Sequence, residues 1–286
     1  MLFSHRVGAG PDGDTGRPGT RSSARRSGHA SCGRAFEAVR VSLRRAQLAW
    51  PWLAALGLAA LVMLPRLASP QFGLLDDGLM LRTGRQVVGS WSTVLHLIPD
   101  TGRFFPGYWL THAVVFALVG ARPFAFFAVN TVVLTVVLAI LGRLVLLAGG
   151  RPPHVWAALI LLAFSGPTVE SFYTASKAEP LQLMWIGGSL LGTAATVLPA
   201  GWIIRAVLSA LGVGALLLAH TTKETSVVML PISIGWLAVA AFSGRRARLR
   251  FAATFVWINV AAALAFLGLR WAYARVYQPC PSGTGA

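Results

Sequence analysis

Long apolar runs recur along this chain, and they constrain its fold more than any other feature. A helix needs about 20 apolar residues to cross a hydrocarbon core of about 30 Å. Hydrophobic residues make up 55% of the 286 residues and charged residues only 12%, so these runs cannot all be buried inside a soluble domain. The sequence therefore predicts an all-α, multi-pass transmembrane helical bundle. The predicted spans are residues 48–65, 124–147, 154–169, 181–198, 203–219, 225–242 and 251–269.

The basic residues indicate how such a bundle is oriented. The net charge is +16, but the arginines lie in tails and short loops rather than on one folded face, so no nucleic-acid partner is predicted. Arginines cluster before the first run and again at residues 245–250, and the positive-inside rule places both clusters in the cytoplasm. An even number of crossings must therefore separate them. The short run at residues 108–120 is the one that we expect not to cross, and we predict that it lies along the outer surface as an amphipathic juxtamembrane helix.

This topology divides the chain into three parts. Residues 1–47 are rich in Gly, Ser and Arg and are predicted to form a disordered, basic cytoplasmic tail. Residues 48–270 form the transmembrane core, and residues 271–286 a short outer C-terminal tail. The first apolar run begins too late for a cleaved signal peptide, so it is predicted to be an uncleaved span. We expect about seven crossings of the plasma (inner) membrane, with the N-terminus in the cytoplasm.

The predicted outer loops contain every acidic residue of the core, although acidic residues were not used to build the topology. These loops are residues 66–123, 165–180 and 220–224, and they stay outside even if the run at 154–169 fails to cross. Ionisable groups beside a membrane often mark function, although plain solvation of loops would produce the same clustering. The acidic residues and lysines concerned are Asp76, Asp77, Asp100, Glu170, Glu179, Glu224, Lys177 and Lys223.

The first outer loop is long and contains two adjacent carboxylates, Asp76 and Asp77. A carboxylate at the membrane surface beside Leu75 and Leu79 would be partly desolvated, which suits it to accept a proton. Adjacent side chains point in different directions, so only one of the two is expected to face a site. The structural alternatives are a helix cap at Asp76 and a turn at Asp77.

The second and third loops each combine a lysine with a carboxylate. If the second loop is helical, Glu170 and Lys177 share a face, where the lysine can hold a phosphate as a point charge. Thr221 and Glu224 fit a capping box for the following apolar run, which gives Glu224 a structural alternative. Lys223 at a helix N-terminus would oppose the helix dipole, so its position indicates a nearby anion.

The remaining polar residues do not indicate a metal or cofactor. The chain has no Cys/His cluster with metal-ligand spacing and no phosphate-binding glycine loop. Scattered histidines such as His112 and His220 are expected to be satisfied single residues rather than ligands. No cofactor is therefore predicted.

At these motifs the chain resembles the GT-C superfamily of polyprenyl-phosphate-dependent glycosyltransferases. It is most similar to bacterial relatives of the protein O-mannosyltransferases and to the transmembrane tetratricopeptide mannosyltransferases. The resemblance covers roughly residues 48–242. Its motifs are the pair Asp76–Asp77, the stretch GRFFPGYWL at 102–110 with the residues at 120–130, the stretch at 167–179, and Lys223-Glu224-Thr225.

The resemblance implies an inverting hexosyltransferase at the non-cytoplasmic face. Asp76 or Asp77 would deprotonate a hydroxyl of a protein or glycan acceptor, and this hydroxyl would attack the anomeric carbon of a sugar carried on a polyprenyl phosphate. Membrane lipid is the other expected partner. The resemblance assigns the departing phosphate to Lys177, Lys223 and Arg103, and the positioning of sugar or acceptor hydroxyls to Glu170, Glu179 and Glu224.

The chain also departs from the pattern that it resembles. The relatives usually have Arg and Asp at the positions of Lys177 and Glu179, and they are longer. One alternative is therefore an inactive or truncated relative, and another is a transporter or scaffold without catalysis. Transporters place polar groups near the midplane, whereas the predicted spans contain few polar residues beyond Asn130 and Asn259.

Overall fold

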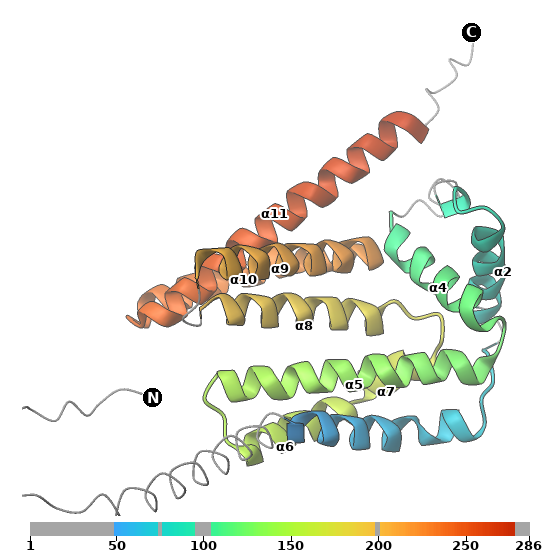
Figure 1. Cartoon of the computed structure of the whole chain (residues 1–286), viewed down its shortest axis with the longest axis horizontal. Coiled ribbons are helices and arrows are strands. Elements are labelled where there is room, and N and C mark those ends of the chain that lie inside the picture. The colour runs from blue at the N-terminus through green and yellow to red at the C-terminus, as the bar shows by residue number, and fades with distance from the viewer. Residues whose placement is uncertain (1–48, 74–75, 95–103, 198–200, 278–286) are drawn as a thin grey trace, which may run out of the picture. The chain divides into compact units, whose positions relative to one another are not determined.

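The computed structural model describes residues 49–73, 76–94, 104–197 and 201–277. Within these residues the regular elements are all helices, with no strand (Figure 1). Five described helices are long and apolar enough to cross a membrane, or six if one bent pair counts as a span. The protein is therefore an all-helical membrane protein. The five are Ala49–Ala68, Pro123–Leu147 (α5), Trp202–Thr222 (α9), Glu224–Phe242 (the 3-10 helix η2, Glu224–Val228, and α10, Met229–Phe242) and Arg246–Val276, which belongs to α11 (Arg246–Tyr277).

The bent pair replaces the predicted span at 154–169. α6 (Pro152–Ala163) and α7 (Gly166–Tyr173) meet at an angle of 56°. The break falls at Ser165, whose hydroxyl accepts the backbone N–H of Thr168 and so caps α7. A proline at the start of α7 cannot continue the hydrogen bonding of α6, which explains the bend.

The helix predicted at residues 108–120 is present as α4 (Pro106–Val119), but it is not amphipathic. Its buried face contains Trp109 and Ala113, and its exposed residues Leu110 and Leu118 are also apolar. α4 ends at Gly120, whose φ of 66° lies in the left-handed region that glycine adopts without strain.

The amphipathic helix of this part of the chain is α2 (Asp76–Gly89). Val87 packs against Tyr108 and Trp109 of α4 and Met80 is also buried, whereas Arg82 and Arg85 are exposed. Asp77 lies within the first turn of this helix, so the turn suggested for it does not form. α2 and α4 pack together beside the start of α5 (Figure 1).

α8 (Glu179–Thr196) is a helix of 18 residues that is less apolar than the other long helices. Its most extensive packing is against α9, with α5 also in contact. A Cβ on Gly192 would lie 3.3 Å from the carbonyl oxygen of Leu208 and 3.6 Å from the Cα of Gly212, so the two helices approach very closely. Ser189 and Thr193 are fully buried. The residues that make α8 less apolar therefore face other helices, as small residues do between membrane helices.

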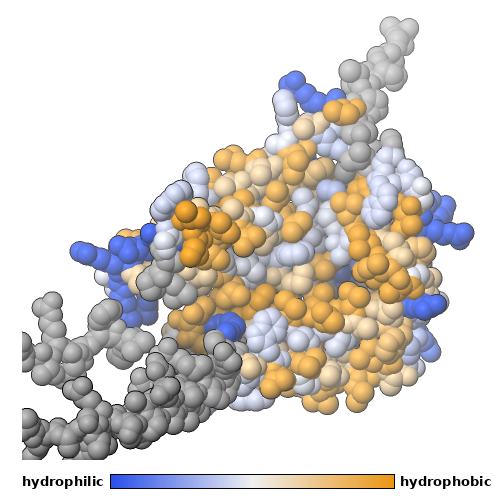
Figure 2. Space-filling view, in the orientation of Figure 1, coloured by the Kyte–Doolittle hydropathy of each residue, from blue (hydrophilic) through white to orange (hydrophobic). Residues whose placement is uncertain are grey.

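The carboxylates and the densest group of arginines lie at opposite ends of the helices (Figure 1). α5 and α8 begin where α9 ends, on the right in Figure 1, and this end carries the carboxylates described below. The starts of α9 and α11 lie at the other end, with Arg205 and the arginines at 245–250. The face shown in Figure 2 is largely hydrophobic between these ends, and its most hydrophilic residues lie mainly toward its margins.

α11 is longer than predicted. It runs unbroken for 32 residues, which is about 48 Å of helix and well beyond the thickness of a hydrocarbon core. The boundary expected at residue 270 therefore falls inside this helix. The predicted tail at residues 1–47 lies outside the described residues.

Candidate functional site

The three loops predicted to lie outside are called here the first connection (66–123), the second connection (165–180) and the third connection (220–224). Asp77 joins the first to the second. Its side chain is only 2% exposed. Oδ2 accepts the backbone N–H of Gly73 at 2.7 Å, and Oδ1 accepts the backbone N–H of Ser176 at 2.9 Å. Hydrogen bonds to an ionised group are about twice as strong as neutral ones, so Asp77 holds the second connection against the start of α2.

Asp76 differs from Asp77 in its exposure and in its hydrogen-bond partners. It is exposed, and among the described residues it has no hydrogen-bond or ion-pair partner. The prediction that the two adjacent acids point in different directions is therefore confirmed. Of the two adjacent aspartates, Asp76 is therefore the exposed one.

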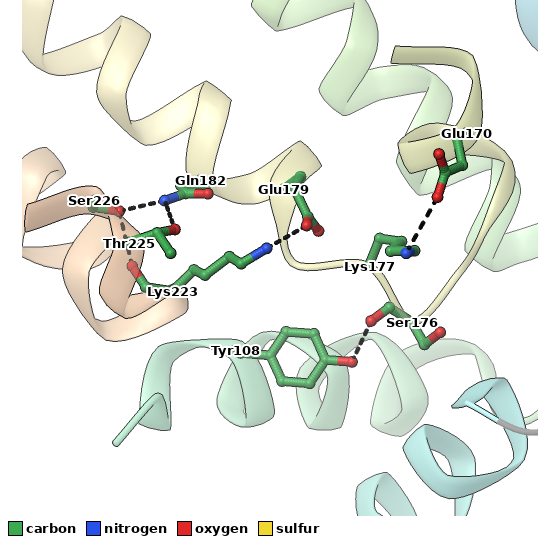
Figure 3. Close-up of polar contacts among 9 residues, drawn as sticks. All are labelled: Tyr108, Glu170, Ser176, Lys177, Glu179, Gln182, Lys223, Thr225 and Ser226. Carbon is green, nitrogen blue, oxygen red and sulfur yellow. Dashed lines mark hydrogen bonds and ion pairs between the residues drawn. The ribbon is translucent and has the colours of Figure 1, made fainter. Parts of the chain in front are cut away.

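Tyr108 is the residue around which these groups gather. It lies in α4, is 7% exposed, and its hydroxyl donates to the backbone oxygen of Ser176 at 2.6 Å (Figure 3). Burial raises the pKa of the phenol above its usual range, and the negative charges of Asp77, Asp76 and Glu179 raise it further. The phenol therefore stays protonated at physiological pH and serves as a hydrogen-bond donor.

His112 lies one turn further along α4, with its ring 4.4 Å from that of Tyr108 between centroids. Burial lowers the pKa of His112 to about 4, although the charge of Asp77 opposes this effect. Nε2 of His112 has no hydrogen-bond partner within the described part of the chain, and the same holds for both ring nitrogens of the buried His220. The expectation that these histidines are satisfied is therefore not met at these three nitrogens within the described residues. His112 is a neutral imidazole close to the Asp77 carboxylate.

Each lysine pairs with a carboxylate of the second connection (Figure 3). Nζ of Lys177 lies 3.5 Å from Oε1 of Glu170, and Lys223 donates to Oε1 of Glu179. The anion that the sequence indicates near Lys223 is thus Glu179. Burial raises the pKa of Glu179, but the hydrogen bond from Lys223, a backbone N–H and the charges of both lysines outweigh burial, so the net pKa lies below its usual range.

The pair between Glu170 and Lys177 does not arise as predicted. The two residues do not share a helix face, because α7 ends at Tyr173. The chain instead folds back between α7 and α8, and this return brings Lys177 beside Glu170. The side chain of Lys177 is 35% exposed and that of Glu170 is 72% exposed.

Glu224 binds the first connection rather than capping a helix. Its Oε1 accepts the backbone N–H of Phe104 at 2.8 Å. The predicted capping box is wrong, because Thr221 still belongs to α9 and its hydroxyl donates to the carbonyl oxygen of Leu218. Glu224 therefore joins the third connection to the first.

Apart from Asp76, the candidate residues that the structure describes belong to three connections that their contacts link. Asp77 and Tyr108 join the first and second connections, Lys223 joins the second and third, and Glu224 joins the third and first. Gln182 adds to these contacts, because its Nε2 donates to Oγ of Ser226 at 2.7 Å and to Oγ1 of Thr225 at 3.1 Å. Two candidates, Asp100 and Arg103, lie outside the described residues.

Tyr108, Ser176 and Gln182 belong to this group but were not predicted from the sequence. Tyr108 falls inside an apolar run, where its ring counts as hydrophobic and its hydroxyl is easily overlooked. Ser176 acts through its backbone N–H and C=O, which no side-chain pattern can reveal. Gln182 could have been found as a polar residue near the start of a predicted span.

Comparisons with known proteins assign no identity to this group of residues. The chain matches no protein-family model, no curated protein and no solved structure. Among the described residues no group of three or more His, Cys, Asp or Glu could hold a metal ion. The polar groups that the described connections bring together are carboxylates, lysines and a phenol.

Proposed function

We propose that the protein is a membrane glycosyltransferase that moves a sugar from a polyprenyl-phosphate donor to an acceptor hydroxyl, with inversion. One observation carries this proposal: carboxylates and lysines from three separate connections meet at one end of the helices. A transferase of this kind needs a base for the acceptor and cations for the departing phosphate. The sequence resemblance to GT-C glycosyltransferases supports the same chemistry.

Asp76 is the base in this proposal, and Asp77 positions it. The oxygens of Asp77 already accept two backbone N–H groups and are buried, so they are poorly placed to take a proton from an acceptor. Asp76 is exposed at the adjacent position. The acceptor hydroxyl gives its proton to Asp76 while its oxygen forms a bond to the anomeric carbon.

The bond that breaks joins the anomeric carbon to the phosphate oxygen, and the polyprenyl phosphate leaves with the bonding electrons. Lys177 is the better placed cation to stabilise this charge. Exposed ion pairs such as that of Lys177 with Glu170 contribute only about 0–1 kcal/mol, so a phosphate can displace the glutamate at little cost. Lys223, held by Glu179, contributes its charge at longer range.

The same proposal includes the topology. α8 becomes a seventh crossing over residues 181–198, because about 27 Å of helix approaches the hydrocarbon thickness and its polar residues face α9. An even number of crossings then separates the arginines before the first span from those at 245–250, so the positive-inside rule places both in the cytoplasm and the linked carboxylates at the outer face of the plasma membrane. The donor then reaches the site within the outer leaflet.

Transfer of label in membranes that contain the full chain tests this function. Membranes receive radiolabelled polyprenyl-phosphate mannose or glucose, and transfer into polar or protein-bound product is measured. We expect Asp76→Asn to lower transfer at least about a hundredfold, the usual contribution of a general base. The matched control is Arg205→Gln, an exposed charge at the opposite end, which should leave transfer unchanged. Undiminished transfer by Asp76→Asn removes the proposed base, and no transfer from either donor overturns the proposed reaction.

A further inference from the structure

Arg66 is held in an unusual way near the end of the first membrane helix. Its guanidinium carbon lies 5.4 Å from the ring centroid of Phe127 in α5 and 5.4 Å from that of Tyr173 in α7. Phe127 is fully buried, and the hydroxyl of Tyr173 donates to the backbone oxygen of Val62 at 2.6 Å. Both rings are thus fixed in place, and they fix the position of the cation.

The charge of Arg66 is positioned without being neutralised. Among the described residues no carboxylate lies within 4.0 Å of Arg66, and its guanidinium contacts the two rings. Lys177 and Lys223, by contrast, each have a carboxylate partner. Cation–π contacts occupy the face of a guanidinium and leave the N–H donors at its edge for another acceptor.

The position of Arg66 along its helix indicates which acceptor this is. Leu61 and Leu64 are 57% and 59% exposed and form an apolar surface just before Arg66. The apolar run ends with the helix at Ala68. Arginines at such a boundary extend toward the layer of lipid phosphates. A guanidinium binds phosphate through two parallel N–H···O bonds, a geometry that a lysine cannot provide.

We propose that Arg66, held between Phe127 and Tyr173, binds the phosphate of a lipid. This site does not depend on the proposed transfer reaction, since the phosphate can belong to an isoprenyl phosphate or to a phospholipid of the leaflet. Tyr173 is the last residue of α7 and precedes the return that contains Ser176, whose backbone N–H binds Asp77.

Binding to the purified full chain in a phosphate-free, non-ionic detergent tests this site. The probes are farnesyl phosphate, a short-chain phosphatidylglycerol, farnesol and inorganic phosphate, with affinities measured by titration calorimetry. We expect at least one of the two lipid phosphates to bind more tightly than farnesol and than inorganic phosphate. Arg66→Gln should weaken that binding at least about tenfold, because a charge-assisted pair of hydrogen bonds is lost. Arg82→Gln removes an equally charged but exposed arginine of α2 and should change the affinity less than about twofold.

Arg66→Lys keeps a cation in place and guards against a folding defect in Arg66→Gln. We expect it to bind the lipid phosphate with an affinity between those of the wild type and Arg66→Gln, because the charge remains but the two-pronged geometry is lost. Preference for farnesyl phosphate would identify a carrier lipid, and preference for phosphatidylglycerol a leaflet lipid. Wild-type affinity in both Arg66 variants, or lipid phosphates that bind no better than farnesol, overturns the proposal. None of these results depends on transferase activity.

Discussion

Asp76 is exposed and Asp77 is buried, although the two residues are adjacent in the first turn of α2. The two aspartates therefore contribute differently, one to stability and the other to reactivity, although the sequence motif does not distinguish them. A buried carboxylate with two backbone donors stabilises the fold, whereas an exposed carboxylate is free to react. Substitution of each residue alone therefore gives different results.

Asp77→Asn should destabilise the protein, and Asp76→Asn should not. An amide at position 77 can accept only one of the two backbone N–H groups and turns its own N–H₂ toward the other, which costs about 1–3 kcal/mol. Loss of the exposed carboxylate at position 76 should change the free energy of unfolding by less than about 0.5 kcal/mol. Thermal unfolding of the purified variants in detergent measures both effects. Equal melting temperatures for the two variants would show that the bonds of Asp77 do not hold the second connection.

The lowered pKa of His112 leads us to expect that the stability of the protein depends on pH. Its pKa falls from 6.5 to about 4 on burial, so the unfolded chain binds a proton between these values and the folded chain does not. The contribution to stability is fully present above pH 6.5 and is lost as the pH falls to about 4, by up to about 3 kcal/mol. We expect His112→Phe to flatten this part of the stability curve. An identical acid-side slope in wild type and His112→Phe would contradict this environment for the imidazole.

At the scale of elements, the contact between α4 and α9 depends on a glycine. A Cβ on Gly107 would lie 2.6 Å from Oγ1 and 3.2 Å from the backbone carbon of Thr221. Because the second of these atoms belongs to the backbone, rotation of a side chain cannot relieve the clash. The two helices must move apart, and the first connection must move with α4.

Gly107→Ala should therefore lower the free energy of unfolding by about 1–3 kcal/mol. Gly78→Ala is the matched control, because a Cβ on this helical glycine of α2 would meet no atom within 4 Å. That substitution should stabilise the protein by about 0.5–1 kcal/mol. Chemical denaturation followed by tryptophan fluorescence measures both. If Gly107→Ala is as stable as the wild type, α4 does not pack on α9 as closely as described.

The helices themselves were largely predictable from the sequence, because a run of about 20 apolar residues has few other stable states in a bilayer. The local details were less so. The amphipathic helix α2 was missed because its apolar pattern extends over only 14 residues. The helix also begins with two aspartates and a glycine, which favour a turn. The bend at Ser165 follows from a proline that lies inside the continuous span predicted at 154–169.

The candidate site was predictable in composition but not in its contacts. The lysines and carboxylates were singled out by their position in three loops, and the described members do lie together. Which carboxylate meets which lysine depends on the return between α7 and α8, and no local pattern encodes that return. Arg66 is likewise an ordinary residue at the end of an apolar run until the fold brings Phe127 and Tyr173 against it.

At the scale of the whole molecule, an apolar band separates two polar ends of the helices (Figure 2). Lysines and carboxylates of the three connections lie at one end of the helices, and the arginines at 245–250 lie at the other. If the band lies in a membrane, the three connections must open to the same aqueous compartment. The proposed transfer reaction requires this arrangement, because its donor, base and cations must meet in one compartment.

Sided cysteine labelling measures this arrangement most directly. In a background where Cys32 and Cys280 are replaced by serine, single cysteines are placed at the exposed positions Gly78, Glu170, Thr225 and Ala247, and intact cells are treated with a membrane-impermeant maleimide. We predict that the cysteines at 78, 170 and 225, one in or beside each connection, react in intact cells and that the cysteine at 247 reacts only after the membrane is opened. Labelling of position 170 or 225 on the same side as position 247 would contradict the account, because the three connections would then share no compartment.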